Sequence, residues 1–120
     1  MKGKTLRIPD YLDHILQAID RASTFLSDVE DVAVFEELFK EQDAVVRCLI
    51  VIGEASTKIL KSDSSFPEQH SDIPWARMSA MRNRIVHDYF EVDLDIVWTT
   101  VKQDLPALRS KIQALLVELR

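Results

Sequence analysis

The stretch AVVRCLIVIGEASTKIL, residues 44–60, decides the fold of this chain. On a helix its apolar residues occupy most of the circumference, and such a helix is buried on nearly all sides. We therefore predict a central helix over residues 42–61. Gly53 interrupts it at a cost of about 1 kcal/mol relative to alanine, so we expect a second helix to cross closely at that point.

Two charged residues lie within this central helix. Arg47 and Glu54 are seven residues apart, which places them on nearly the same face. Buried charges need partners, so one interpretation is that both point toward a polar site. The other is that both are solvated at the helix edge. The single cysteine, Cys48, is interpreted as a small buried residue in a protein of a reducing compartment.

Two further helices are predicted before the central one. Pro9 and Asp10 suit the first turn of a helix over residues 9–27. His14, four residues after Asp10, could pair with it. Asp31 suits the start of a short helix that bends toward the central one.

The rest of the chain is predicted to be a loop followed by three helices. Residues 62–74, rich in serine, aspartate and proline, form the loop. The three helices cover residues 74–89, 93–103 and 104–120. Asp104 and Pro106 open the last of them. Five to six helices with short connections predict an all-α fold, an antiparallel bundle that forms a single domain over residues 1–120.

The charge balance restricts contacts with nucleic acids. Twenty acidic and fifteen basic residues give a net charge of −5, the wrong sign for binding nucleic acid through overall charge. Any such contact must be local, and residues 73–87 contain Arg77, Arg82 and Arg84 without an acidic residue. No apolar run is long enough for a signal peptide or a membrane span, so we expect a cytoplasmic protein.

The run MRNRIVHDYF, residues 81–90, gathers polar and titratable side chains at the end of a predicted helix. Arg82 and His87 lie about 140° apart on a regular helix. We therefore expect the helix to end or loosen near His87. Asn83 and Tyr89 could then converge with these two residues on a cleft.

These residue types suit the cleavage of RNA without a metal ion. That reaction needs a base for the 2′-hydroxyl, an acid for the leaving 5′-oxygen and positive charge near the phosphorus. His87 can exchange protons near neutral pH, and Arg82 offers a forked donor for phosphate oxygens. Asn83 could orient a phosphate or the imidazole, and Tyr89 could donate a hydrogen bond or stack on a base. One histidine leaves one proton-transfer role open, which a dimer would fill.

Two other interpretations stay open. Arginine and histidine near a helix C-terminus also complement its dipole, and Arg84 with Asp88 has the spacing of an ordinary surface ion pair. The second is a metal-dependent phosphohydrolase. In such enzymes the metal ligands occur along the chain in the order His, His-Asp, Asp, and His70, the pair His87-Asp88 and Asp104 follow that order. Against it, His70 lies in the predicted loop and Asp104 looks like a helix cap.

The run from Arg82 to Tyr89 resembles the Arg-x4-His-x-Tyr signature of the HEPN superfamily, and the flanking sequence is similar to its HepT branch. The similarity extends from about residue 10 to the C-terminus. The supporting matches are Arg47, Ile52-Gly53-Glu54-Ala55, Ile73-Pro74-Trp75, Met81, Val92-Asp93, Val97-Trp98 and Leu105-Pro106. Their spread and order make the resemblance specific.

The resemblance implies a toxin of a bacterial or archaeal toxin–antitoxin pair, acting as a metal-independent endoribonuclease in a homodimer without a cofactor. It implies that Arg82 and His87 are catalytic. Asn83, Asp88 and Tyr89 then hold supporting positions. The implied partner is a minimal nucleotidyltransferase antitoxin that attaches AMP to Tyr89, where added phosphate would block the RNA phosphate site. Alternatively, the chain is a dimeric binding partner and nucleotidylation target with little cleavage of its own.

Overall fold

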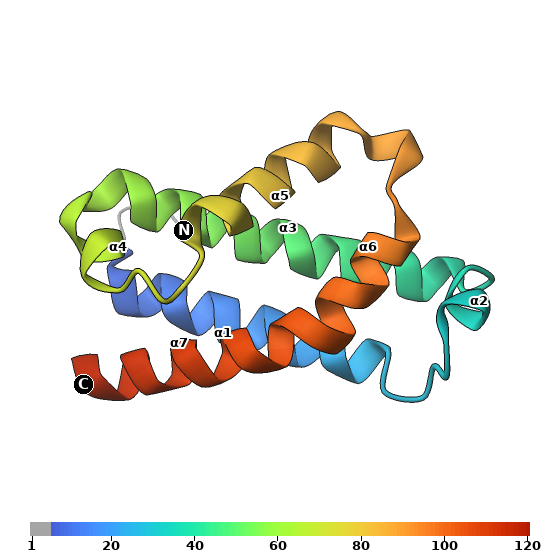
Figure 1. Ribbon diagram of the computed structural model, residues 1–120, viewed down its shortest axis with the longest axis horizontal. Helices are drawn as coiled ribbons and strands as arrows, with labels where there is room; N and C mark the ends of the chain where they lie inside the picture. The colour runs from blue at the N-terminus through green and yellow to red at the C-terminus, as the bar shows by residue number, and fades with distance from the viewer. Residues whose placement is uncertain (1–5) are drawn as a thin grey trace.

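The structure is a computed structural model that describes residues 6–120, except for the side chain of Tyr89. Within that part every regular element is a helix (Figure 1), which confirms the all-α fold. The elements are α1 (Ile8–Phe25), α2 (Val32–Phe35), α3 (Phe39–Ser62), α4 (Ser65–Gln69), α5 (Trp75–His87), the 3-10 helix η1 (Tyr89–Glu91), α6 (Leu94–Thr99), the π-helical η2 (Thr100–Asp104) and α7 (Leu105–Leu119).

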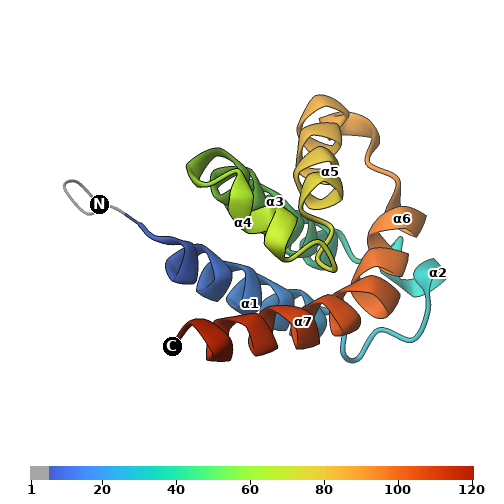
Figure 2. The same ribbon diagram turned by 60° about the vertical axis from the view of Figure 1, so that its left-hand side comes forward.

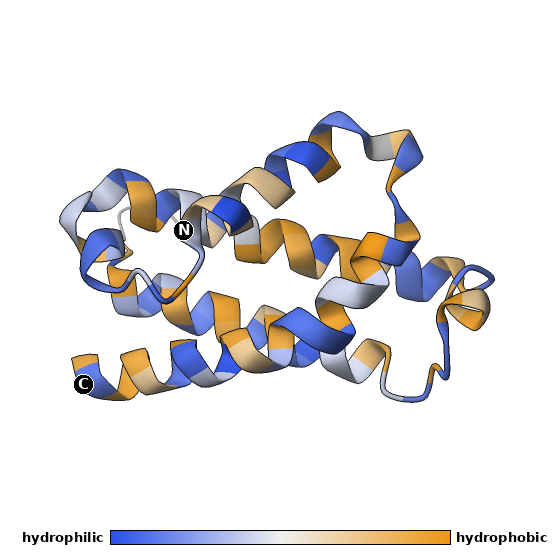
Figure 3. Ribbon diagram, in the orientation of Figure 1, coloured by the Kyte–Doolittle hydropathy of each residue, from blue (hydrophilic) through white to orange (hydrophobic). Residues whose placement is uncertain are grey.

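α3 is the central helix, with α1 on one side and α5 on the other, and α7 lies beside α1 (Figures 1 and 2). Apolar residues recur along α1, α3 and α7, interleaved with hydrophilic ones (Figure 3). The side chains with no exposed surface include Leu12, Ile15 and Ile19 of α1, Ile52 and Ile59 of α3, and Ile112 of α7. The prediction of a central helix over residues 42–61 is confirmed. Its predicted burial on nearly all sides is wrong, because one face of α3 carries the exposed residues Arg47 and Lys58.

α5 crosses α3 at Gly53, and the approach is close. A Cβ atom added to Gly53 would overlap the Cβ of Arg82 and would lie 2.7 Å from the carbonyl oxygen of Met78. One turn further along α3, the hydroxyls of Thr57 and Ser79 share a hydrogen bond of 2.5 Å. The expected close crossing is confirmed, and it brings the stem of Arg82 onto α3.

Two predicted helix starts are confirmed by their hydrogen bonds. The carboxylate of Asp31 accepts a backbone N–H at the start of α2. The carboxylate of Asp10 accepts the N–H of Arg7, directly before α1, at 2.8 Å. The possible pair between His14 and Asp10 is not among the ion pairs of the described residues, and the His14 ring lies edge-on to that of Tyr11.

The prediction of a loop over residues 62–74 is wrong in part, because this segment contains α4. Phe66 is buried, and its ring centroid lies 5.9 Å from that of Trp75. The indole N–H of Trp75 donates to the carbonyl of His70 at 3.0 Å. The short helix is therefore held by tertiary contacts with the start of α5, which local composition does not reveal.

The prediction of a separate helix that starts at Asp104 is also wrong, because α6, η2 and α7 follow one another without a break. Asp104 has helical backbone angles, and its side chain caps no N–H group. Pro106 lacks the N–H that a regular helix needs at that position. The wider π-helical turn lies directly before it and accommodates the missing bond.

Cys48 is buried in α3, as expected. Burial raises the pKa of its thiol, while the positive charges of Arg21 and Arg47 act in the opposite direction. Across residues 6–120 we find no helix with both the length and the apolar character that a bilayer span requires.

Candidate active site

α5 carries the predicted catalytic run and ends within it. The N–H of Asp88 donates to the carbonyl of Arg84 at 2.9 Å and closes the last α-helical turn. The helix therefore ends at His87, as expected, but it stays regular up to that residue. Arg82 and His87 accordingly remain about 140° apart around the axis of α5, and no hydrogen bond or ion pair joins them among the described residues.

Arg82 is held by three neighbours. Its stem lies across Gly53, its Nε is 3.3 Å from Oε1 of Glu54, and its Nη1 donates a hydrogen bond of 3.0 Å to Oδ1 of Asn83. Nε is buried, and no acceptor in the described part is aligned with it for a hydrogen bond. The contact with Glu54 is therefore an ion pair without hydrogen-bond alignment. The Arg82 side chain is 34% exposed, so the anchored guanidinium keeps an edge in solvent.

The two charged residues of α3 have different environments. Glu54 points toward a polar site, namely Arg82, and its side chain is 45% exposed. Arg47 is exposed and forms no ion pair with any other residue that the structure describes. Neither interpretation therefore holds for both residues, because Glu54 pairs with Arg82 and Arg47 is exposed.

His87 and Asp88 are exposed at the end of α5. The expected ion pair between Arg84 and Asp88 is wrong, because none joins them in the described residues. Asp88 is the C-cap residue, with φ −104° and ψ 40°, and this non-helical backbone removes the regular four-residue alignment. The side chain of Tyr89 lies outside the described residues, and its backbone begins η1.

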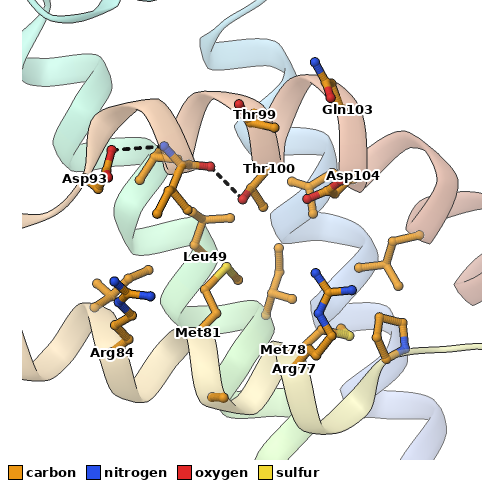
Figure 4. A pocket seen from close by; sticks show the side chains of 18 of the residues that line it. Leu49, Arg77, Met78, Met81, Arg84, Asp93, Thr99, Thr100, Gln103 and Asp104 are labelled. Atoms are coloured by element: carbon orange, nitrogen blue, oxygen red, sulfur yellow. Dashed lines mark hydrogen bonds between the residues drawn. The ribbon is translucent and has the colours of Figure 1, made fainter.

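A groove of about 820 Å³ lies between α5 and the continuous segment from α6 to α7 (Figure 4). Arg77 and Arg84 stand on the α5 wall, while Asp93 and Asp104 belong to the opposite wall (Figure 4). Neither predicted catalytic residue lines this groove. Its acidic wall also makes it a poor site for phosphate.

The metal-dependent interpretation finds no ligand set among the residues described. No three histidine, cysteine, aspartate or glutamate side chains converge there. His70 is the C-cap residue directly after α4, with its ring centroid 4.6 Å from that of Phe66. Asp104 lies in η2 on the groove wall. The predicted order of ligands is therefore not assembled into a site.

A second cavity, of about 650 Å³, is lined by residues of α1 and α3. Its polar and aromatic lining residues are Tyr11, His14, Arg47, Glu54 and Lys58. Our sequence reasoning missed this cavity. The available signal was the spacing of the three charged residues on α3, which recur after seven and four positions and so share one face. The contribution of α1 depends on packing and has no sequence signal.

Comparison with known proteins assigns these residues to a family. A family model described as "Ribonuclease HepT-like" matches residues 15–115. The chain belongs to the HepT-like ribonuclease family. The matched region of this HepT-like chain contains all of α3 and α5, and therefore Gly53, Glu54, Arg82 and His87.

Relatives of this HepT-like chain carry corresponding names. A "Probable ribonuclease HepT" of Thermococcus cleftensis is 39% identical over 109 residues, which cover 88% of this chain and 93% of the relative. A relative from Caldanaerobacter subterraneus subsp. tengcongensis, named as a presumed RNase, is 35% identical, and the match covers 88% of this chain and 91% of the relative. Another, from Methanocaldococcus jannaschii and also named as a presumed RNase, is 33% identical and covers 93% of each chain. No solved structure matches this chain.

Proposed function

We propose that this chain is a metal-independent endoribonuclease that uses Arg82 and His87 as catalytic residues and acts as a homodimer. Membership of the HepT-like family supports ribonuclease activity, and the relative named "Probable ribonuclease HepT" agrees with it. The observation that carries the assignment of residues is the fixed position of Arg82, an arginine that is anchored by its stem and still open to solvent along one edge.

In the proposed reaction Arg82 binds the scissile phosphate. The 2′-hydroxyl of RNA loses its proton to a base and attacks the phosphorus, and the bond from phosphorus to the 5′-oxygen breaks. The leaving oxygen takes a proton from an acid. The Arg82 guanidinium balances the negative charge that develops on the phosphorane. His87, exposed at the end of α5, serves in one of the two proton transfers.

A homodimer supplies what one chain lacks in this scheme. Within one chain, regular α-helical geometry keeps Arg82 and His87 on different sides of α5. A second copy that packs against this end of α5 would bring its own His87 near Arg82. Val86, between them, is 43% exposed and would supply apolar area for that contact.

The proposed setting is a toxin–antitoxin pair in which a minimal nucleotidyltransferase antitoxin attaches AMP to Tyr89. The supports are the resemblance of residues 82–89 to the HEPN signature and the backbone position of Tyr89, two residues after His87. The phosphate of the AMP group would then compete with RNA for the guanidinium of Arg82.

A second candidate function is that of a dimeric binding partner and nucleotidylation target that cleaves RNA weakly. It is favoured by the net charge of −5 and by the angle of about 140° that separates Arg82 and His87 around the axis of α5. The two functions differ in whether the purified, unmodified chain degrades RNA.

The test is cleavage of a mixed pool of RNA and tRNA in excess EDTA, with the intact mass of each protein recorded. Arg82→Lys keeps the stem against Gly53 but loses the fork, and His87→Ala loses the proton carrier. We expect both to lose activity. Arg109→Ala is the matched control, because this exposed arginine of α7 pairs with Asp20 and takes no part in the site.

The outcomes separate the hypotheses. Undiminished cleavage by His87→Ala would overturn the proposed mechanism. No cleavage by a wild-type protein of unmodified mass would favour the binding-partner function. No cleavage by a protein that carries added AMP masses would identify a neutralised toxin.

A further inference from the structure

The cavity between α1 and α3 lies beside the proposed catalytic arginine. It is about 650 Å³ in volume, and Glu54 belongs to its lining. Because Glu54 is also the ion-pair partner of Arg82, a molecule in this cavity would lie next to the residue that we expect to bind the scissile phosphate.

The α3 side of the cavity is positively charged. Arg47, Glu54 and Lys58 lie within about 20° of a common line along the helix. The carboxylate of Glu54 is engaged by Arg82. Arg47 and Lys58 are exposed, and neither forms an ion pair with another residue in the described part. Since α3 rises about 1.5 Å per residue, the backbone positions of these two residues lie roughly 16 Å apart along the helix, on either side of the Glu54 contact.

The α1 side of the cavity is aromatic. The rings of Tyr11 and His14 are 6.4 Å apart in an edge-on arrangement, and Ile50 and Val51 add apolar lining from α3. Aromatic rings beside a cationic track are the features by which proteins hold single-stranded nucleic acid, with bases on the rings and phosphates on the cations. The groove on the far side of α5 lacks this pattern, since its opposite wall is acidic.

We propose that this cavity binds nucleotides of single-stranded RNA adjacent to the scissile phosphate. Arg47 and Lys58 contact phosphates on either side of the one held by Arg82, and the ring of Tyr11 packs against an unpaired base. This inference rests on the proposed function for the identity of the ligand. It adds the path of the strand and the requirement that the bases be unpaired.

The test measures binding of a short fluorescent oligoribonucleotide to the His87→Ala protein, in EDTA, by fluorescence anisotropy over a range of salt. The double change Arg47→Gln with Lys58→Gln should weaken binding by about tenfold or more at low salt and reduce the slope of log affinity against log salt by about 0.7 for each lost phosphate contact. Tyr11→Leu should weaken binding of the single strand by about tenfold, and it should not affect binding of a duplex of the same sequence.

The matched control is Arg21→Gln with Lys40→Gln, which removes two exposed positive charges outside both the cavity and the positive segment of α5. We expect it to retain the affinity and the salt slope. Unchanged binding after loss of Arg47 and Lys58 would overturn the proposed subsite. Equal weakening in the control would also overturn it, because it would indicate that RNA is attracted by positive charges anywhere on the surface and not by this cavity. If binding depends on the cavity while the wild-type protein fails to cleave RNA, the subsite stands and the ribonuclease proposal fails.

Discussion

The side chain of Arg82 lies across Gly53 and beside Glu54, so the residue that we propose for phosphate binding also fills part of the interface between α3 and α5. The short signature from Arg82 to Tyr89 identifies this arginine from the sequence. Its partner Glu54 lies 28 residues earlier (82 − 54), and only the helix crossing brings the two together. Gly53 signalled in the sequence that another helix crosses closely there, but the sequence did not show that Arg82 is the residue packed against it.

Replacement of Gly53 tests this arrangement. In Gly53→Ala the added Cβ overlaps that of Arg82, so α5 must shift away from α3. Alanine favours the helix by about 1 kcal/mol, but overpacking costs about 1–3 kcal/mol, so we expect lower stability in urea unfolding together with a loss of RNA cleavage. Asp43→Ala, at an exposed position of the same helix, should change stability by no more than about 0.5 kcal/mol. Unaltered stability and cleavage in Gly53→Ala would contradict the close crossing.

Glu54 should act by positioning Arg82. Glu54→Gln keeps the shape of the side chain but removes the charge that orients the guanidinium. We expect kcat/KM for RNA to fall by roughly 10- to 100-fold, with partial recovery in Glu54→Asp. Asp20→Asn breaks a comparable exposed ion pair with Arg109 at 2.6 Å, far along the sequence from the site, and should leave kcat/KM unchanged. Equal effects of the two changes would argue against a specific role for Glu54.

The buried thiol of Cys48 predicts a pH dependence. Burial raises its pKa above the ordinary value of 9.0, so the folded chain retains a proton that the unfolded chain releases. This contribution to stability is complete below the ordinary value and is lost as the pH rises through the raised one. In urea unfolding across that pH range, the free energy of unfolding should therefore fall more steeply with pH for wild type than for Cys48→Ala. Parallel curves would refute the prediction.

At the scale of helices, local sequence signals identified the long helices and the short α2, but they missed α4 and the π-helical turn. The apolar character of α3 and the carboxylates before α1 and α2 are local signals, and the structure contains the corresponding helices. α4 depends on the contact between Phe66 and Trp75, which local composition cannot supply. The π-helical turn before Pro106 depends on continued packing of α7 against α1, which makes an unbroken helix preferable to a cap at Asp104.

The bond from the Trp75 indole to the carbonyl of His70 should stabilise α4. Trp75→Phe retains an aromatic ring but removes the indole donor, which leaves the His70 carbonyl with its bond from the N–H of Ile73. The expected cost is about 0.5–1.5 kcal/mol in urea unfolding. Hydrogen exchange should also increase in α4. Trp98→Phe is the control, since the Trp98 ring contacts Phe35 and Lys102 without an indole hydrogen bond in the described part. A larger loss from the control would contradict this account.

At the scale of the whole molecule, one chain leaves the proposed catalytic residues on separate sides of α5. The signature identifies both residues from the sequence, but the convergence that we expected from it does not occur within the described chain. Regular helical geometry is sufficient to explain why, since α5 remains α-helical to its end. A sequence motif therefore names residues without stating whether one chain or two must bring them together.

Mixing two inactive variants tests the proposed dimer. If Arg82 of one chain acts with His87 of the other, a mixed dimer of Arg82→Lys and His87→Ala contains one intact pair. Random exchange of subunits should then restore roughly a quarter of wild-type cleavage, since half of the dimers are mixed and each has one working site. Each variant alone should remain inactive. No recovery after verified exchange would mean that both residues act within one chain.

The packing order of the helices also bears on the order in which the chain folds during its synthesis. The ion pair between Glu54 and Arg82 forms within the consecutive segment from α3 to α5. By contrast, α1 needs α7 to cover its buried face, and the pair between Asp20 and Arg109 joins residues 89 positions apart. Chains emerge from the ribosome N-terminus first. The pair that fixes the arginine can therefore form while α7 is still being made, and the first helix of the bundle waits for the last before its buried face is fully covered.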